Sequence, residues 1–537
     1  MQIGAPALRA PAAATVAALL AIAVLPTTAA SAAAVLPGPA TTAASAASPG
    51  VTPPAATGDP AGGAVPRAAP CRSDLPRLRY LVLFAAGTRA DAARDEIEAA
   101  CGVLSGYYSE IAVAVATSTD GTFDSRIGRD RAYSAQAEAV TRPAAPRRRP
   151  AALPRAVGVQ SLGTEVAEAA VAAEAAETGG RIGEQWDMTM IGANRARAQR
   201  PGSSDVLVGV LDSGVDADHP DLFTAIDRSA SAGCDTGVPD PSPSAWRPGG
   251  PGGGHGTHVA GIIAAADDGA GITGVAPGVR IAAVKVVDAA GFIYPEYAVC
   301  GFMWAARNGM RIANHSYFVD PWLFTCDDQP GQAVVHEALR RAAGYATAHG
   351  VLSVAAAGNE ALDLADPTVD TSSPNNARTQ RARPVDNHCD VLPAELPDVL
   401  TVSAVGAGGV KSSYSSYGAG VVDIAAPGGD VRQRPPAANS GCVLSTVPGG
   451  YGRMCGTSMA APHVSGVAAL VASAHPSAGP AQLASLLLSS ATPVACPDGG
   501  YDPDSNGTAD ARCTPSPGAG NGFYGAGMVN AVAAVAG

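Results

Sequence analysis

The sequence is poor in charged and aromatic side chains and has no long apolar run beyond its first 32 residues. Charged residues make up 15% and aromatic residues 5% of the 537 residues. A membrane-spanning helix needs about 20 consecutive apolar residues, and no later segment reaches that length, so we expect no membrane anchor. The motifs C-x-x-C and H-E-x-x-H are also absent, which argues against a zinc ribbon and against a zinc hydrolase.

The net charge of −12 is unevenly distributed along the chain. Before Trp186 there are 16 basic and 16 acidic residues, and from Trp186 onward there are 19 basic and 31 acidic residues. An acidic C-terminal part argues against nucleic acid and anionic membranes as partners. A chain of this length is also longer than one hydrophobic core usually organises, so we expect two or more structural units.

The first 70 residues are typical of an export signal followed by a linker. Residues 1–32 combine Arg9, the apolar run AAATVAALLAIAVLP and an A-x-A site at 30–32, which are the parts of a signal peptide. The apolar run is too short, and its flanks are wrong, for a membrane anchor. Residues 33–70 are rich in Ala, Pro and Thr and predict a disordered linker. We therefore expect a secreted, extracellular protein.

Ten cysteines fit an oxidising compartment. Two of them, Cys71 and Cys101, lie in the N-terminal region, and the other eight lie after Trp186. An even number in each region suggests disulfides, but eight cysteines allow 105 pairings, so the connectivity stays open. Two pairs that are close in sequence are hypotheses: Cys442–Cys455 and Cys496–Cys513.

Residues 71–166 predict a small α+β domain. The segment RYLVLF is rich in strand-forming residues, TRADAARDEIEAACG has a helical pattern with an acidic start, and YSEIAVAVAT alternates as a strand does. A Pro- and Arg-rich stretch interrupts the pattern, so we expect an insertion near 128–155. Residues 167–185 predict a linker, and no group in these regions is an evident catalytic side chain.

From residue 186 to residue 537, short apolar runs alternate with amphipathic helical patterns. DVLVGVLD, RIAAVKVV, VLSVAAAG and VLTVSAVG are runs of the first kind, and AVVHEALRRAAGYATAHG is a pattern of the second kind. Apolar strands between helices predict an α/β fold, with a mostly parallel twisted sheet that helices cover on both faces. In such sheets the functional residues collect beyond the carboxyl ends of the strands.

A carboxylate and an imidazole lie at boundaries of these predicted elements. Asp212 ends the run VLVGVLD, at the edge of the sheet where functional groups collect, although an aspartate there also suits a turn. His255 follows a glycine-rich loop and begins a helix, where a carboxylate can orient its ring. His258 is the rival, and we expect it to be packed behind the site. A metal pair of the two histidines would need further ligands.

Two further candidates are an amide and a hydroxyl. Asn359 follows the strand pattern VLSVAAAG and either serves a turn or donates its amide N–H to a developing oxyanion. Ser458, in YGRMCGTSMAAPHVSG, begins a helix and is either a cap or a nucleophile. A helix start supplies a backbone N–H and a field that favours negative charge. His463 lies five residues on, on another side of the helix, and is a poor candidate for the base.

The chain order Asp212, His255, Ser458 is one of the known orders for an orienting acid, a base and a nucleophile. LDSG, HGTHVAG, AAAGNE and GTSMAAPHVSG resemble the four signatures of the subtilisin-like serine proteases, the subtilase family, nearly letter for letter. QWDMTMIGA resembles the opening segment of many secreted members, and YGAGMVNAVAA resembles their closing helix. The resemblance covers 186–537 and implies a subtilisin-like fold and serine endopeptidase activity.

The resemblance implies a role for each candidate. Ser458 would attack the peptide carbonyl, and His255 would take its proton. Asp212 would hold the imidazole in the right tautomer and stabilise the imidazolium. Asn359 and the backbone N–H of Ser458 would form the oxyanion hole, and this chemistry requires no cofactor.

Substrate and metal sites are also implied by the resemblance. Ser316 and Gly358 would bind substrate in the cleft, but Phe318 stands where the family has a small glycine, and its bulk would narrow or reshape the cleft. Asp221 and Asp268 match places where many subtilases use oxygen ligands for a structural calcium ion. The remaining ligands would be backbone carbonyls, so plain loop carboxylates are the alternative.

The resemblance further implies that the domain at 71–166 is a propeptide, which assists folding and blocks the cleft until it is cleaved between 166 and 186. We expect a monomer that acts on protein or peptide substrates. Two alternatives stay open: a dedicated processing protease with few substrates, and a non-catalytic pseudoprotease that binds peptides. The complete set of four site residues argues against the pseudoprotease.

Overall fold

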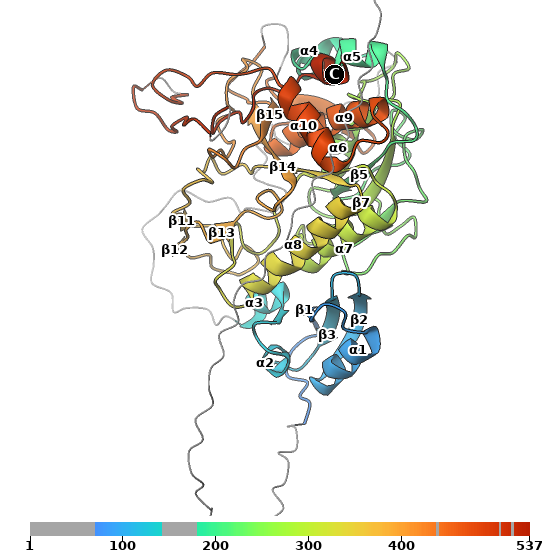
Figure 1. Cartoon of the computed structure of the whole chain (residues 1–537), viewed down its shortest axis with the longest axis vertical. Coiled ribbons are helices and arrows are strands. Elements are labelled where there is room, and N and C mark those ends of the chain that lie inside the picture. Colours follow the sequence, from blue (N-terminus) through green and yellow to red (C-terminus); the bar gives the residue numbers. More distant parts are fainter. Residues whose placement is uncertain (1–69, 142–179, 436–439, 504–505, 517–519, 537) are drawn as a thin grey trace, which may run out of the picture. The chain divides into compact units, whose positions relative to one another are not determined.

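The structure, a computed structural model, describes most of the chain from Pro70 onward (Figure 1). The predicted signal peptide and nearly all of the linker after it lie outside the described residues, as do the end of the predicted insertion and most of the predicted processing region. No helix in the described part of the chain is long and apolar enough to cross a membrane. The described ranges are 70–141 and 180–536, without 436–439, 504–505 and 517–519.

The first described segment folds into a four-stranded antiparallel sheet with three helices. The strand order is β2-β3-β1-β4. The sequence predicts β1, β3 and α1 but not β2, because its two glycines weaken a strand pattern. The elements are β1 (Leu78–Leu83), α1 (Ala90–Ala99), β2 (Gly102–Tyr108), β3 (Val113–Ser118), α2 (Phe123–Ile127), β4 (Ala132–Tyr133) and α3 (Ala135–Thr141).

The second described segment is built on a seven-stranded sheet. The strand order is β15-β14-β10-β8-β5-β7-β6, and every neighbouring pair is parallel. This confirms the predicted α/β fold class. The strands are β5 (Leu207–Asp212), β6 (Ala232–Gly233), β7 (Arg280–Lys285), β8 (Ile312–His315), β10 (Leu352–Ala356), β14 (Val399–Val405) and β15 (Ile424–Pro427).

Helices cover both faces of this sheet, as predicted (Figure 1). Two helices, α6 and α9, pack in one large core cluster, and α7 and α8 pack in a second cluster. Because the strands are buried on both faces, their sequences are continuous apolar runs rather than alternating ones. The four helices are α6 (His255–Ala264), α7 (Pro295–Arg307), α8 (Gln332–Ala348) and α9 (Thr457–Ala474).

Strand β1 of the N-terminal sheet contributes to two cores, because successive side chains of a strand point to opposite faces. Leu81 and Leu83 belong to the cluster that contains α7 and α8. Tyr80 and Val82 belong to a separate cluster with Ile97 of α1. The N-terminal sheet is therefore placed between its own helix and the α7–α8 layer.

The central strands end at the same level. In the parallel ladders, Leu211 of β5 pairs with His315 of β8, and His315 pairs with Ala355 of β10. The residues that follow therefore leave the sheet side by side at its carboxyl edge. The chain order also reverses around β5, because β7 lies on one side of it and β8 on the other. Such a switch point is where α/β sheets bind ligands.

All ten cysteines are paired, and both pairs hypothesised from the sequence are present. The disulfides are Cys71–Cys101, Cys234–Cys300, Cys326–Cys389, Cys442–Cys455 and Cys496–Cys513. The remaining helices are η1 (Ile182–Glu184), α4 (Trp186–Met190), α5 (Ala193–Gln199), α10 (Pro480–Ser490) and α11 (Ala531–Ala536). The remaining strands are β9 (Thr325–Cys326), β11 (Val369–Asp370), β12 (Arg383–Pro384), β13 (Cys389–Asp390), β16 (Val443–Val447) and β17 (Gly450–Met454).

Candidate active site

Asp212 and His255 are in direct contact. Asp212 is the last residue of β5, and its side chain is fully buried. Its Oδ1 lies 2.7 Å and its Oδ2 2.9 Å from Nδ1 of His255. A carboxylate accepts hydrogen bonds, so Nδ1 donates, and Oδ1 also accepts one from the backbone N–H of Ser213 at 2.7 Å. The contact fixes the orientation of the imidazole and turns Nε2 away from the carboxylate.

The first turn of α6 can approach the end of β5 because residue 256 is a glycine. A Cβ at Gly256 would lie 2.5 Å from the carbonyl oxygen of Gly214 and 3.0 Å from Cβ of Asp212. A side chain there would displace α6, so Gly256 allows His255 to reach Asp212. The backbone N–H of Gly256 also donates to Oγ of Ser213 at 3.0 Å.

Two further histidines that the sequence motifs contain, His258 and His463, are buried and hydrogen-bonded within the protein. Nε2 of His258 lies 3.2 Å from the carbonyl oxygens of both Val443 and Gly452, so it donates. Burial lowers the pKa of His258 to about 3, so the ring is neutral and packed, as predicted. Nε2 of His463 lies 3.0 Å from Oδ2 of Asp187.

Ser458 is the second residue of α9 and is 3% exposed. Its Oγ donates to the carbonyl oxygen of Ser316 at 3.2 Å. Pro462 has no backbone N–H, so it cannot make the helical hydrogen bond to the carbonyl of Ser458 four residues earlier. Oγ of Ser316 donates to that carbonyl instead, at 2.9 Å. The proline therefore allows the segment after β8 to bind the backbone of the predicted nucleophile.

A buried chain of side-chain hydrogen bonds extends this connection. Nδ2 of Asn314, in β8, donates to Oγ of Ser316 at 2.8 Å. Oγ of Ser465, in α9, donates to Oδ1 of Asn314 at 2.9 Å. Asn314 lies outside the sequence motifs, and GTSMAAPHVSG contains Ser465 without indicating a role for it. The available signal was a polar residue inside the strand pattern IANHSY, because a buried amide needs a partner.

Asn359 lies beside the start of α9, and its amide has a fixed orientation. Its Oδ1 accepts hydrogen bonds from the backbone N–H and Oγ1 of Thr457, at 2.9 and 2.8 Å. The donor end, Nδ2, therefore lies on the other side, and a Cβ at Gly456 would be 3.4 Å from it. Gly358 has a φ of +103°, which favours glycine, and its N–H donates to Oγ1 of Thr457 at 3.2 Å.

The structure thus joins Ser316, Gly358, Asn359 and Ser458 around the start of α9, and it pairs Asp212 with His255. The hydroxyl of Ser316 is already hydrogen-bonded within the protein, to the carbonyl of Ser458. A substrate that lies beside this segment would therefore contact the backbone of Ser316. The ring of Phe318 packs in a buried cluster below this segment. Its effect on the shape of the cleft stays a prediction.

Asp221 and Asp268, the predicted calcium ligands, do not form an open cage of oxygens. The buried carboxylate of Asp221 accepts hydrogen bonds from Oη of Tyr451, which is 3.0 Å from each oxygen, and from the backbone N–H of Ile272 at 3.0 Å. Burial raises the pKa of Asp221. A Cβ at Gly271 would lie 1.9 Å from Oη of Tyr451, so the hydroxyl fills the space beside the carboxylate. Asp268 is exposed. As arranged, these groups do not fit a calcium ion, so we expect no ion to bind between them.

A paired aspartate and histidine, together with a serine at a helix start and an amide after a neighbouring parallel strand, are the side chains typical of a serine hydrolase. Residues 203–525 match the model of the subtilase family, Peptidase_S8. Because this match covers more than half of the chain, the chain belongs to the subtilase family of serine-type endopeptidases. The resemblance seen in the sequence motifs is confirmed.

Among curated proteins, subtilisin NAT of Bacillus subtilis subsp. natto is 33% identical over 308 residues, which are 57% of this chain and 66% of that protein. The alignment therefore spans just under two thirds of this relative. Subtilisin of Bacillus pumilus is also 33% identical over 308 residues, which are 91% of its length. Fervidolysin of Fervidobacterium pennivorans is 32% identical over 320 residues, 57% of this chain and 40% of that protein.

Two solved structures show the same fold. The epidermin leader peptide processing serine protease EpiP of Staphylococcus aureus aligns with a TM-score of 0.59 at 18% identity, over 86% of this chain and 98% of that chain. The nisin leader peptidase NisP of Lactococcus lactis aligns with a TM-score of 0.50 at 24% identity, over 66% of this chain and 94% of that chain. At these identities the likeness describes the fold alone.

Replacing Ser316 tests the connection to α9. Ser316→Ala removes the donor to the carbonyl of Ser458 and the acceptor of Nδ2 of Asn314, both of which are buried. We expect the free energy of unfolding to fall by about 1–3 kcal/mol, measured by urea unfolding. Ser485→Ala, at an exposed position of α10, is the control and should change it by less than about 0.5 kcal/mol. Equal losses in the two variants would contradict the assigned role of Ser316.

Metal removal tests the arrangement at Asp221. An ion present at 100 times its Kd would stabilise the fold by about 2.7 kcal/mol, which shifts Tm by several degrees. The hydroxyl of Tyr451 already binds both carboxylate oxygens of Asp221. We therefore expect EDTA to leave Tm within about 2 °C of its value in calcium. A clear drop in EDTA that added calcium reverses, and that is lost in Asp221→Asn, would show that this site binds the ion.

Proposed function

We propose that this chain is a secreted serine endopeptidase, made as an inactive precursor, that hydrolyses peptide bonds through an acyl-enzyme. The observation that carries the proposal is the contact between Asp212 and Nδ1 of His255, together with Ser458 and Asn359 at the ends of neighbouring elements. An aspartate that only served a turn would not need a buried imidazole partner. Family membership supports the same chemistry.

In the proposed reaction, Oγ of Ser458 turns from the carbonyl of Ser316 to another staggered rotamer and attacks the peptide carbonyl. Nε2 of His255 takes the hydroxyl proton and then gives it to the leaving amine. Asp212 keeps the proton of the neutral ring on Nδ1 and stabilises the imidazolium. Water, activated by the same histidine, then attacks the acyl-enzyme and releases the acid product.

The proposed oxyanion hole is formed by Nδ2 of Asn359 and the backbone N–H of Ser458. The first is aimed by the two hydrogen bonds that Oδ1 of Asn359 accepts from Thr457. The second belongs to the first turn of α9, whose N–H groups have no partner within the helix. Donors that are already oriented stabilise the negative oxygen without reorganisation. No step of this reaction requires a cofactor.

The N-terminal domain is proposed to act as an intramolecular inhibitor of the peptidase part. In its support, Nη1 of Arg79 donates to Oη of Tyr297 on α7 at 2.9 Å, and Oη of Tyr108 donates to the carbonyl of Gly237 at 2.8 Å. Export is supported by the five disulfides, which are typical of oxidising compartments. The signal peptide at 1–32 and cleavage between 166 and 186 stay part of this proposal.

A dedicated processing protease with few substrates is the second candidate. The observation in its favour is Phe318, whose bulk stands where the family has glycine and which packs under the segment next to Ser458. A peptide library separates the two candidates. Cleavage of many unrelated sequences supports the general endopeptidase, and cleavage confined to one short motif supports the processing role.

Ser458→Ala tests the proposed function. We expect casein hydrolysis to fall by at least about 10⁴-fold, because the nucleophile is lost. The variant precursor should also keep its full size, whereas the wild type should be shortened. Ser485→Ala, at the exposed helix position, should behave as the wild type. Equal activity in Ser458→Ala and wild type would contradict the mechanism.

Asn359→Ala tests the oxyanion hole separately. We expect kcat to fall by about 10²–10³-fold, the range found when subtilisin loses one such donor, with little change in KM. Steady-state kinetics on a peptide substrate measure both quantities, and Asn387→Ala, at an exposed position, is the control. A fall in kcat of less than about threefold would remove Asn359 from the proposed site.

A further inference from the structure

Two long segments that follow neighbouring strands of the central sheet form one body, which we call the disulfide lobe. Its first part, 320–332, follows β8 and the segment 316–319. Its second part, 361–396, follows β10 and the segment 357–360. Both parts therefore continue directly from the two segments that flank Ser458, which we call the cleft walls.

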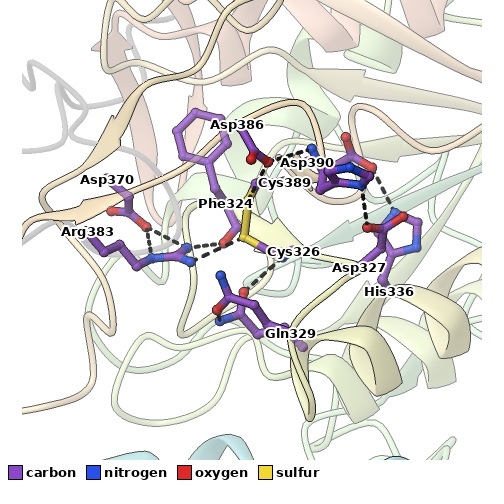
Figure 2. The surroundings of a disulfide bond; sticks show 12 residues. Phe324, Cys326, Asp327, Gln329, His336, Asp370, Arg383, Asp386, Cys389 and Asp390 are labelled. Atoms are coloured by element: carbon purple, nitrogen blue, oxygen red, sulfur yellow. Dashed lines mark hydrogen bonds and ion pairs between the residues drawn. A yellow bond between two sulfur atoms is a disulfide. The ribbon is translucent and has the colours of Figure 1, made fainter.

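The two parts of the disulfide lobe are cross-linked (Figure 2). Cys326 and Cys389 form a disulfide and lie opposite each other on the antiparallel strands β9 and β13. The backbone N–H of Leu323 donates to Oγ of Ser373 at 2.7 Å. The lobe is thus a single unit rather than two independent loops.

The disulfide lobe also packs against both cleft walls. One buried cluster contains Phe318 of the first wall, Ala357 of the second wall, and Phe324, Leu364 and Val385 of the lobe. The pairing of β8 with β10 ends at His315, just before the first wall begins, so the sheet does not hold the wall itself. Beyond that point the backbone N–H of Val319 donates to the carbonyl of Leu392 in the lobe, at 2.9 Å.

The side chain of Arg383 connects the two parts of the disulfide lobe (Figure 2). Its Nε and Nη2 donate to Oδ2 of the buried Asp370 at 3.1 and 2.9 Å. Nη2 also donates to the carbonyl of Phe324, and Nη1 lies 3.4 Å from Sγ of Cys326. The guanidinium stands over the ring of Trp322, 4.8 Å from its centroid. One side chain therefore bonds the second part of the lobe to the backbone, sulfur and ring of the first part.

We propose that Arg383 is a positioning residue for extended peptide substrates: it holds the disulfide lobe in the shape that sets the spacing of the two cleft walls. The inference rests on the proposed endopeptidase function. Ser458 is part of α9, and His255 is held by Asp212 of β5. Asn359 lies in the second wall, but Thr457 of α9 holds its amide through two hydrogen bonds. Losing Arg383 should therefore leave these three groups in place. A peptide that lies along both walls would bind less well, whereas a small substrate that reacts at Ser458 would not.

The test compares two substrates on the full-length chain. Wild type and Arg383→Met are assayed with an octapeptide and with a nitrophenyl ester of one acylated amino acid. We expect KM for the octapeptide to rise by about tenfold, with kcat for the peptide and kcat/KM for the ester within about twofold of wild type. Arg383→Lys keeps the charge but not the planar fork, and should give an intermediate KM.

Arg378→Met is the matched control, because Arg378 is an exposed arginine of the same lobe segment, and it should behave as the wild type. An unchanged octapeptide KM in Arg383→Met, or equal losses on both substrates in a folded variant, would overturn the inference. If Arg383→Met does not fold, Asp370→Asn decides in its place, with the same expected split. A wild type inactive on both substrates would instead contradict the proposed function.

Discussion

The parallel register of β5, β8 and β10 is the constraint on which the site depends. Pairing of Leu211 with His315, and of His315 with Ala355, makes the three strands end together. The groups that follow them therefore meet at one edge, although more than 140 positions separate Asp212 from Asn359 along the chain. A shift of one position in any ladder would turn each side chain to the opposite face.

Burial makes the arrangement specific, because each buried polar group there must have a partner. Pro462 leaves the carbonyl of Ser458 without its helical donor, and Oγ of Ser316 supplies one. The backbone N–H and the hydroxyl of Thr457 both donate to Oδ1 of Asn359 and so fix the orientation of its amide. The helix start thus has its own partners before any substrate arrives, so little reorganisation remains for the proposed reaction.

The sequence predicts the fold class and the order of the main elements from apolar periodicity, and the four motifs propose Asp212, His255, Gly358, Asn359 and Ser458 as site residues, because both signals are local. The interactions that support them are not local. The hydrogen bond from Asn314 to Ser316, the hydroxyl of Tyr451 at Asp221 and the packing of Phe318 each depend on segments far apart in sequence. The two glycines of β2 weaken its strand pattern in the sequence, and β2 is recognised as a strand through its pairing with β3.

Labelling with a fluorophosphonate, followed by mass spectrometry of the labelled peptides, shows whether Ser458 is an activated nucleophile. The reagent modifies a serine only when a base activates it and an oxyanion hole accepts the tetrahedral oxygen. We expect one labelled peptide with the adduct on Ser458, and no labelling after His255→Ala. A wild-type protein that takes up no label, or takes it up on another serine, would contradict this role of Ser458.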